Sequence, residues 1–348
     1  MATSILEREI HEQPEVLARL IASQEAAARD LAAAVHRREV RFAIIAARGT
    51  SDNAGRYAQY LLGIANGLPV ALATPSIFTL YHRPPHLEGA LVIGISQSGE
   101  SPDIVEVVEE GRRQGALTLA ITNVADSPLA RAAEHCLLLH AGEERAVAAT
   151  KTHTAQLAAL ALFSVALGED GERMAALREM PERVAVVLER TADAARRAAE
   201  RWLHAERGVV IGRGYNYGTA FEIALKLTEL TYLHIEPYSS ADFRHGPMAL
   251  VEPNFPALFI APDGAVFEEV LDLLQAMRER GADLLVISDR GEALALASAS
   301  LPLPPGTPEW LSPLVTVVPG QLLALRLAEA RGLDPDRPRG LQKITRTL

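Results

Sequence analysis

Residues 41–67 read RFAIIAARGTSDNAGRYAQYLLGIANG, and the order of their patterns decides the fold class. The apolar run that opens the stretch is short and ends at Gly49, as is typical of a buried strand. From Ser51 onward the apolar residues recur at helical spacing, and Ser51 and Asp52 favour a helix N-terminus. The stretch therefore predicts a strand, a tight loop and a helix, which is the repeating unit of parallel α/β proteins.

The same alternation continues through the first half of the chain. Strands are predicted at 68–74, 89–96 and 116–123, a helix at 101–115 with Pro in its first turn, and helical structure over 5–37. Strands that alternate with helices indicate a doubly wound parallel sheet covered on both faces, the three-layer α/β/α arrangement of flavodoxin-like folds.

A second copy of this unit lies in the C-terminal half. GVVIGRGYNYGTAFEIALKLTEL at 208–230 matches the opening unit, and LQAMRERGADLLVISD at 274–289 matches 109–123. Arg48-Gly49 aligns with Arg213-Gly214, an offset of 165 residues, and the second match has an offset of 166. Two matches at nearly one offset indicate a tandem duplication. We expect an N-terminal helical segment at 1–37, a first domain at 38–165, connecting helices at 166–200, a second domain at 201–334 and a C-terminal tail at 335–348.

Composition narrows the classes of partner and compartment. The chain has 348 residues, enough for two domains, and a net charge of -10, which disfavours nucleic acid and anionic membranes as partners. Its one cysteine, Cys136, lies in the apolar run HCLLLH, so we expect a buried structural thiol and no disulfide. The N-terminus has no apolar signal segment, and no apolar run reaches membrane-spanning length. We therefore expect a cytoplasmic protein.

The two copies differ in the loop after their third strand. The first copy has ISQSGES at 95–101, and the second has IAPDGAV at 260–266. Ligands of parallel α/β sheets bind at the carboxyl ends of strands, where helix N-termini offer free N–H groups to anions. Only the first loop is rich in hydroxyls, so we expect an anion site in the first half. The candidate donors are Ser96, Gln97, Ser98 and Ser101.

Plainer interpretations stay open for these loops. Ser101 could simply cap the helix that follows, and Ser51 could cap the helix at 51–67. Glu100 and Asp103 oppose an anion site unless they point away. Lys151, which opens another helical stretch, could reach a ligand or could be solvated.

A second set of polar residues lies in the C-terminal half. Glu222, Lys226 and Glu229 share one face of the helix predicted at 221–234. This face is either an exposed salt-bridged stripe or, because apolar residues flank it, the wall of a cleft. His245 lies in a turn beside Gly246, and Lys343 lies in a basic C-terminal tail. No Cys, His and carboxylate residues have metal-ligand spacing, and the near match G-R-G-Y-N-Y-G at 212–218 is one residue too long for a dinucleotide fingerprint. We expect no metal and no organic cofactor.

Seven motifs together resemble the tandem sugar isomerase (SIS) domain proteins, in particular the isomerase half of glutamine–fructose-6-phosphate aminotransferases. In chain order they are E-I-H-E-Q-P (9–14), G-T-S (49–51), S-Q-S-G-E-S (96–101), A-T-K-T-H-T-A-Q-L (149–157), A-L-K-L-T-E-L-T-Y (224–232), R-H-G-P-M-A-L (244–250) and P-R-G-L-Q-K (338–343). The likeness covers nearly the whole chain.

The resemblance implies a role for each matching residue. Glu229 would move a proton between C1 and C2 of the sugar, and Lys343 would contact the open-chain ketose or form an imine with it. His245 would assist ring opening from the partner subunit of a homodimer, and Lys226 would complete the catalytic set. The substrate-binding residues implied are Thr50, Ser51, Ser96, Gln97, Ser98, Ser101, Val147, Ala148 and Glu222.

The resemblance implies an isomerase and deaminase that converts glucosamine-6-phosphate to fructose-6-phosphate and ammonia, or the reverse. This chain begins at the isomerase region, so we expect no glutaminase activity. Ala149 and Gly340 depart from the family pattern, which leaves the sugar and its amine substituent open. The alternatives are a deglycase of phosphorylated fructosamines, a non-catalytic sugar-phosphate sensor and, more remotely, a nicotinamide oxidoreductase.

Overall fold

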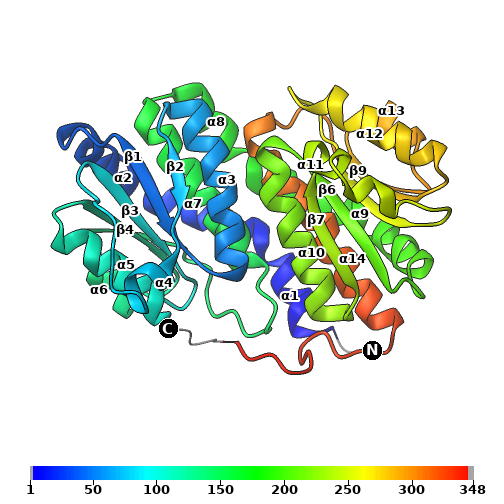
Figure 1. Cartoon of the computed structure of the whole chain (residues 1–348), viewed down its shortest axis with the longest axis horizontal. Helices are drawn as coiled ribbons and strands as arrows, with labels where there is room; N and C mark the ends of the chain where they lie inside the picture. Colours follow the sequence, from blue (N-terminus) through cyan, green and yellow to red (C-terminus); the bar gives the residue numbers. More distant parts are fainter. Residues whose placement is uncertain (1–2, 344–348) are drawn as a thin grey trace. The chain divides into compact units, whose positions relative to one another are not determined.

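A computed structural model describes residues 3–343, which form two compact units (Figure 1). Among the described residues, the N-terminal unit comprises Glu15–Glu144, Lys151–Glu179 and residues 342–343. The C-terminal unit comprises residues 3–14, Arg145–Thr150 and Met180–Leu341. Each unit has a five-stranded parallel sheet covered by helices, which confirms the predicted α/β class.

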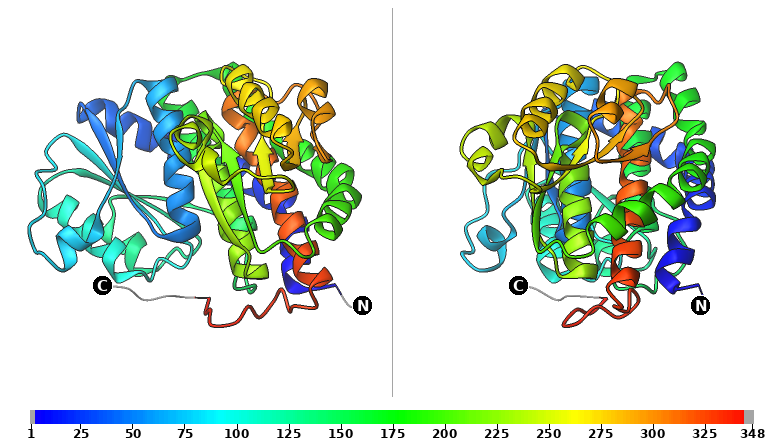
Figure 2. Two further views of the ribbon diagram at one scale, coloured as in Figure 1. Left: turned by 45° about the vertical axis from the view of Figure 1, so that its right-hand side comes forward. Right: turned by 90° about the vertical axis from the view of Figure 1, so that its right-hand side faces the viewer.

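In the N-terminal unit the sheet order is β2-β1-β3-β4-β5. From β1 the chain crosses to β2 at one edge of the sheet, and from β3 it crosses to β4 in the direction of the other edge. Because right-handed connections are the rule, the helices in these two crossovers lie on opposite faces of the sheet (Figure 2). The strands are β1 (Phe42–Ala46), β2 (Val70–Leu72), β3 (Ala90–Ile95), β4 (Leu117–Thr122) and β5 (His135–Leu138). The helices are α2 (Gln13–Arg37), α3 (Gly49–Asn66), α4 (Pro75–Thr79), α5 (Pro102–Arg113), α6 (Pro128–Ala132), α7 (Lys151–Gly168) and α8 (Gly171–Arg178).

The C-terminal unit repeats this plan with the order β10-β9-β8-β6-β7, which confirms the duplication. Its strands are β6 (Arg207–Gly212), β7 (His234–Ser239), β8 (Pro256–Ile260), β9 (Asp283–Ser288) and β10 (Ala299–Pro302). Its helices are α1 (Ile5–His11), α9 (Met180–Arg201), α10 (Tyr217–Thr231), α11 (Ser240–Arg244), α12 (Phe267–Glu279), α13 (Gly291–Ala295) and α14 (Ser312–Ala330), with 3-10 turns η1 (Gly214–Asn216), η2 (Pro247–Leu250) and η3 (Glu309–Leu311).

The central strands of the N-terminal sheet are fully buried in the core. Every residue of β3 and of β4 is buried, because helices cover both faces of a parallel sheet. The helical segment predicted over 5–37 is divided into α1 and α2 at Glu12. Pro14 in the first turn of α2 has no N–H to donate, so the hydrogen-bond ladder of α1 cannot run through it.

One sequence expectation was wrong. Among the described residues, Glu309–Ala330 is long and apolar enough to cross a membrane by length and composition alone. Within the fold, however, 94% of its most apolar window is buried, and α14 packs against α9 and α10. The apolar run has a packing explanation, since a helix that is buried on all sides needs apolar residues all round.

The contact between α10 and α14 gives a test of this packing. Gly320 of α14 lies against the fully buried Ile223 of α10, and a Cβ at Gly320 would overlap that side chain. We expect Gly320→Ala to lower the free energy of unfolding by about 2 kcal/mol, because the core cannot make room for the methyl group. Urea unfolding followed by circular dichroism measures the change.

The matched control is Gly63→Ala. Gly63 lies in α3, is exposed and has open space where its Cβ would be. The same substitution there should raise stability by up to about 1 kcal/mol, because alanine favours the helix. Equal effects at the two glycines would contradict the close α10–α14 contact.

Candidate functional site

The predicted phosphate loops meet at the centre of the N-terminal sheet. β1 and β3 are neighbours there, and the chain leaves them toward opposite sides. In doubly wound sheets this switch point leaves a crevice between the two following loops, where ligands bind. Those loops are the start of α3, with Thr50 and Ser51, and the segment 96–101 before α5.

The loop before α5 is held in one shape by its own hydroxyls. Ser96 is buried, and its Oγ accepts the Gly99 N–H at 3.2 Å and lies 3.3 Å from Ser101 Oγ. Ser98 Oγ accepts the Glu100 N–H at 3.2 Å. These short-range bonds hold the backbone of the loop in one conformation at the N-terminus of α5, and backbone N–H groups at a helix N-terminus are able to bind anions.

Gln97, near the start of this loop, is fixed by the end of β4 and the turn that follows it. The carbonyl oxygen of Gln97 accepts the Asn123 N–H at 3.1 Å and the Thr122 hydroxyl at 3.3 Å. Gly99 has a φ of +66°, and a Cβ there would overlap the Ser127 side chain. Only glycine therefore satisfies both the backbone angle and the space at this position.

Asp103 and Asp52, two carboxylates near the loop, each have an arginine partner that offsets their charge. Asp103 is fully buried and accepts a hydrogen bond from Arg48 Nε at 2.8 Å. Burial raises the pKa of Asp52, while the nearby guanidinium of Arg56, 3.0 Å away, acts in the opposite direction. Ser101 occupies the N-cap position of α5 as expected, but its side chain makes no capping hydrogen bond. The plain interpretation is therefore confirmed for the positions of Ser101 and Pro102, but not for a capping bond from the Ser101 side chain.

In the loop after β1, Ser51 does not cap the following helix, contrary to the plain interpretation of the sequence. Helix α3 begins at Gly49, whose φ is +52°, so Ser51 lies inside the first turn and is not the N-cap. Ser51 is buried, and its Oγ accepts a hydrogen bond from Gln156 Nε2 of α7 at 2.9 Å. Thr50 is half-buried in the same turn.

A buried carboxylate that the sequence analysis missed lies before α7. Both side-chain oxygens of Glu144 accept bonds from Thr152, one from its N–H at 3.1 Å and one from its hydroxyl at 2.8 Å. Lys343 Nζ lies 2.7 Å from Glu144 Oε2. Lys151 is buried and donates to the carbonyl oxygen of Glu143 at 2.6 Å, so it is not the solvated side chain considered from the sequence.

In the C-terminal unit, α10 carries the second set of predicted site residues, Glu222, Lys226 and Glu229. Lys226 Nζ lies 2.6 Å from Glu229 Oε2 and 3.5 Å from Glu222 Oε1. The side chains of Glu222 and Lys226 are 0% and 1% exposed, whereas Glu229 is 22% exposed. The stripe is thus not an exposed salt-bridged face. Its flanking residues Ile223 and Leu227 are fully buried, and only Glu229 keeps an opening to solvent.

Residues 145–148 are positioned by the first helix. The Glu9 carboxylate of α1 is buried and accepts the backbone N–H groups of Arg145 at 2.5 Å and Ala146 at 3.2 Å. Val147 is half-buried and Ala148 is buried in this segment. The motif at 9–14 thus has a structural task that the sequence did not reveal, because the partners of Glu9 are more than 130 residues away.

His245 and the tail lie at the ends of α11 and α10. His245 is exposed, and its N–H donates to the carbonyl oxygen of Asp242 at 3.0 Å. Within residues 3–343, no hydrogen bond or ion pair joins it to the α10 cluster. Tyr232 ends α10 with a φ of +59°, and its hydroxyl accepts the Arg339 N–H at 2.8 Å while the Arg339 guanidinium lies 4.0 Å above its ring.

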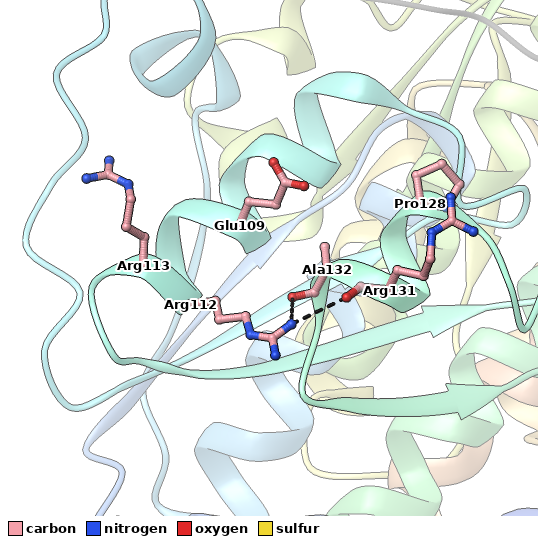
Figure 3. Close-up of a pocket in the computed structure, with 6 residues that line it drawn as sticks. All are labelled: Glu109, Arg112, Arg113, Pro128, Arg131 and Ala132. Atoms are coloured by element: carbon pink, nitrogen blue, oxygen red, sulfur yellow. Dashed lines mark hydrogen bonds between the residues drawn. The ribbon is translucent and has the colours of Figure 1, made fainter.

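A separate pocket of about 460 Å³ lies at the far end of α5 (Figure 3). Arg112 donates there to the carbonyl oxygens of Arg131 at 3.4 Å and Ala132 at 3.3 Å, and Arg113 pairs with Glu110. The two Arg112 bonds join α5 to α6, and the pocket is lined by none of the predicted site residues. The side chains that line it are Glu109, Arg112, Arg113, Pro128, Arg131 and Ala132.

Comparisons with known proteins agree with this architecture. The model of the family described as SIS domain matches residues 38–166 and 203–330. A glutamine–fructose-6-phosphate aminotransferase [isomerizing] of Thermus thermophilus is 37% identical over 97% of this chain, which spans 58% of that relative's length.

Two solved structures cover almost the whole chain. A protein from Silicibacter pomeroyi, provisionally named a phosphosugar isomerase, has a TM-score of 0.87 and 33% identity, covering 96% of this chain and 100% of its own. The C-terminal domain of the glucosamine-fructose-6-phosphate aminotransferase of Francisella tularensis has a TM-score of 0.86 and 29% identity, covering 97% and 98%.

The buried cluster on α10 predicts a large cost for removing its cation. Lys226→Met keeps the aliphatic stem but leaves Glu222 and Glu229 without the ammonium group between them. We expect the free energy of unfolding to fall by about 3 kcal/mol, measured by urea titration. The double variant Glu222→Gln/Lys226→Met should recover most of this loss.

An exposed pair at the same helical spacing serves as the control. Arg196 and Glu200 of α9 are 55% and 60% exposed, so Arg196→Met should leave the unfolding midpoint nearly unchanged. A cost at Lys226 no larger than that at Arg196 would contradict the burial of the α10 cluster.

We expect the Cys136 thiol to react slowly with alkylating reagents. It is free and half-buried, and burial raises the pKa of its thiol from 9.0 to about 11. A raised pKa favours the neutral thiol, so the thiolate fraction at neutral pH should be about 100-fold lower than that of an exposed cysteine. Iodoacetamide labelling at pH 7.5 should be correspondingly slow and should accelerate in urea; equal rates in both conditions would disprove this.

Proposed function

The chain belongs to the SIS domain family, and on that premise we propose that it isomerises an amino sugar phosphate, converting glucosamine-6-phosphate to fructose-6-phosphate with release of ammonia. The named aminotransferase relatives support the choice of an amino sugar. The observation that carries the proposal is the α10 cluster, where a partly exposed carboxylate is held 2.6 Å from a buried ammonium group.

Aldose–ketose isomerisation requires a base that carries a proton between two adjacent carbons. We assign this role to Glu229, because it is the member of the cluster with access to solvent. Lys226 would hold the carboxylate in place, and the buried Glu222 would fix the ammonium group from the other side. This arrangement supports a carboxylate that is oriented before the substrate arrives.

The sugar phosphate is assigned to the switch point of the N-terminal sheet. Phosphate oxygens favour hydroxyl and backbone N–H donors at a helix N-terminus, which the loop before α5 and the first turn of α3 offer. Local donors are needed because the net charge of -10 gives no general attraction for an anion. The proposed donors are Thr50, Ser51, Ser96, Gln97, Ser98 and Ser101, with Val147 and Ala148 contacting the sugar.

The remaining roles follow the family resemblance. His245 is assigned to ring opening, and its exposed position directly after α11 suits a residue that acts on the substrate of a partner subunit in a homodimer. Lys343 is assigned to the carbonyl carbon of the open-chain ketose. We also propose a cytoplasmic location and the domain limits 38–165 and 201–334 given above.

A direct assay tests the proposed reaction. Purified chain and glucosamine-6-phosphate should yield ammonia and fructose-6-phosphate in equal amounts, measured by coupled enzymatic assays. Glu229→Gln should lower kcat by at least about 100-fold, because the amide cannot accept the proton. Glu236→Gln, an exposed carboxylate on β7, is the control that should leave the rate unchanged.

Each contrary result points to a definite alternative. Normal turnover in Glu229→Gln would exclude this residue as the proton carrier. Turnover of fructosamine-6-phosphate adducts but not of glucosamine-6-phosphate would identify a deglycase. Tight binding of sugar phosphates with no turnover of any of them would identify a sensor.

A further inference from the structure

The ion pair between Lys343 and Glu144 is the strongest feature that the proposed roles leave unexplained. The Glu144 side chain is 0% exposed, and that of Lys343 is 24% exposed. The two residues are 199 positions apart in the sequence, and the lysine belongs to the C-terminal tail. A buried carboxylate that faces a tail lysine is a costly arrangement unless it has other donors.

Those other donors come from α7. The Thr152 N–H and hydroxyl bind the two oxygens of Glu144 at 3.1 and 2.8 Å, and Thr152 is itself fully buried. Thr152 lies in the first turn of α7, where free N–H groups and the helix dipole favour a negative charge. Thr152 therefore fixes the position of the carboxylate, and the Lys343 ammonium group contacts the same Oε2 atom as the Thr152 hydroxyl.

We propose that Glu144 is the positioning residue for Lys343. The inference rests on the proposed function, in which Lys343 meets the carbonyl carbon of the open-chain ketose. Glu144 holds Nζ at one place and accepts the proton that the ammonium group must lose before it can attack. A flexible lysine near a chain end gains reactivity when its nitrogen is held close to the reacting carbon.

The chemistry balances without any further reagent. The Lys343 ammonium group gives one proton to the Glu144 carboxylate, and the neutral amine adds to the carbonyl carbon. The carbon–oxygen bond then breaks, the oxygen leaves as water with the two remaining amine hydrogens, and a carbon–nitrogen double bond forms. Hydrolysis reverses these steps and returns the proton from Glu144 to Lys343.

The test traps this imine on the full chain. The protein is incubated with fructose-6-phosphate and sodium borohydride, and the reduced adduct on Lys343 is quantified by peptide mass spectrometry. Glu144→Gln should slow adduct formation by at least about tenfold, because the amide cannot accept the proton or hold the ammonium group. Fructose-6-phosphate binding, measured without borohydride by titration calorimetry, should change by less than about twofold.

Two controls separate positioning from a structural role. Glu143→Gln removes a neighbouring exposed charge and should leave the trapping rate unchanged. In a Lys343→Ala background, Glu144→Gln should cause no further loss of turnover, because its effect acts through the lysine. A residue that merely capped α7 would lower turnover, thermal midpoint and binding to the same extent in both backgrounds, and that result would overturn the inference.

The trapping experiment also separates this inference from the proposed function. Wild-type trapping rates in Glu144→Gln would refute the positioning role while deamination stands. If the wild-type chain formed no adduct on Lys343, the inference would fail in either case, and turnover of glucosamine-6-phosphate would then show whether the proposed reaction survives.

Discussion

The constraint on which the rest depends is the parallel order of the strands. In a parallel sheet all carboxyl ends lie at one edge, and right-handed crossovers send the chain to opposite faces where the order reverses. In each unit this reversal lies between the first and third strands of the copy, at β1 and β3 and at β6 and β8. The fold thus creates two equivalent places for a ligand before any particular side chain is considered.

The two copies fill these places differently. In the C-terminal copy, backbone N–H groups of the loop after β8 already bind carboxylates of the protein. The Ala265 N–H donates to Glu309 Oε2 at 3.0 Å, and the Asp263 N–H donates to Asp289 Oδ1 at 2.8 Å. Carboxylates that already accept these N–H groups repel a further anion. In the N-terminal copy the corresponding loop is arranged by the hydroxyls of Ser96 and Ser98. This divergence after the duplication is the reason why we propose the anion site in the N-terminal copy.

The features that could be predicted from the sequence are those that leave a pattern in the residues of one segment. Buried strands, helices and the duplication follow from apolar runs and spacing, and they are confirmed because each depends on neighbours in the chain. The position of Ser51 was misjudged, since α3 begins at Gly49 and its N-cap is Arg48, three residues before Ser51. Glu9 and Glu144 were missed altogether. The residues that they hold in place, Arg145 and Lys343, are more than 130 positions away from them, and no periodicity links residues so far apart.

The tail shows how a segment without regular secondary structure acquires a position. Asp336 accepts the N–H groups of Ile5 and Leu6 at 2.9 and 2.8 Å, Arg339 binds Tyr232, and Lys343 binds Glu144. These anchors are polar, and a single such hydrogen bond contributes only about 1 kcal/mol. Segments held by a few bonds of this size open locally at much lower cost than the core. Lys343 held in this way has a defined position, yet it is able to leave Glu144 at low cost, as the proposed attack on a carbonyl carbon requires.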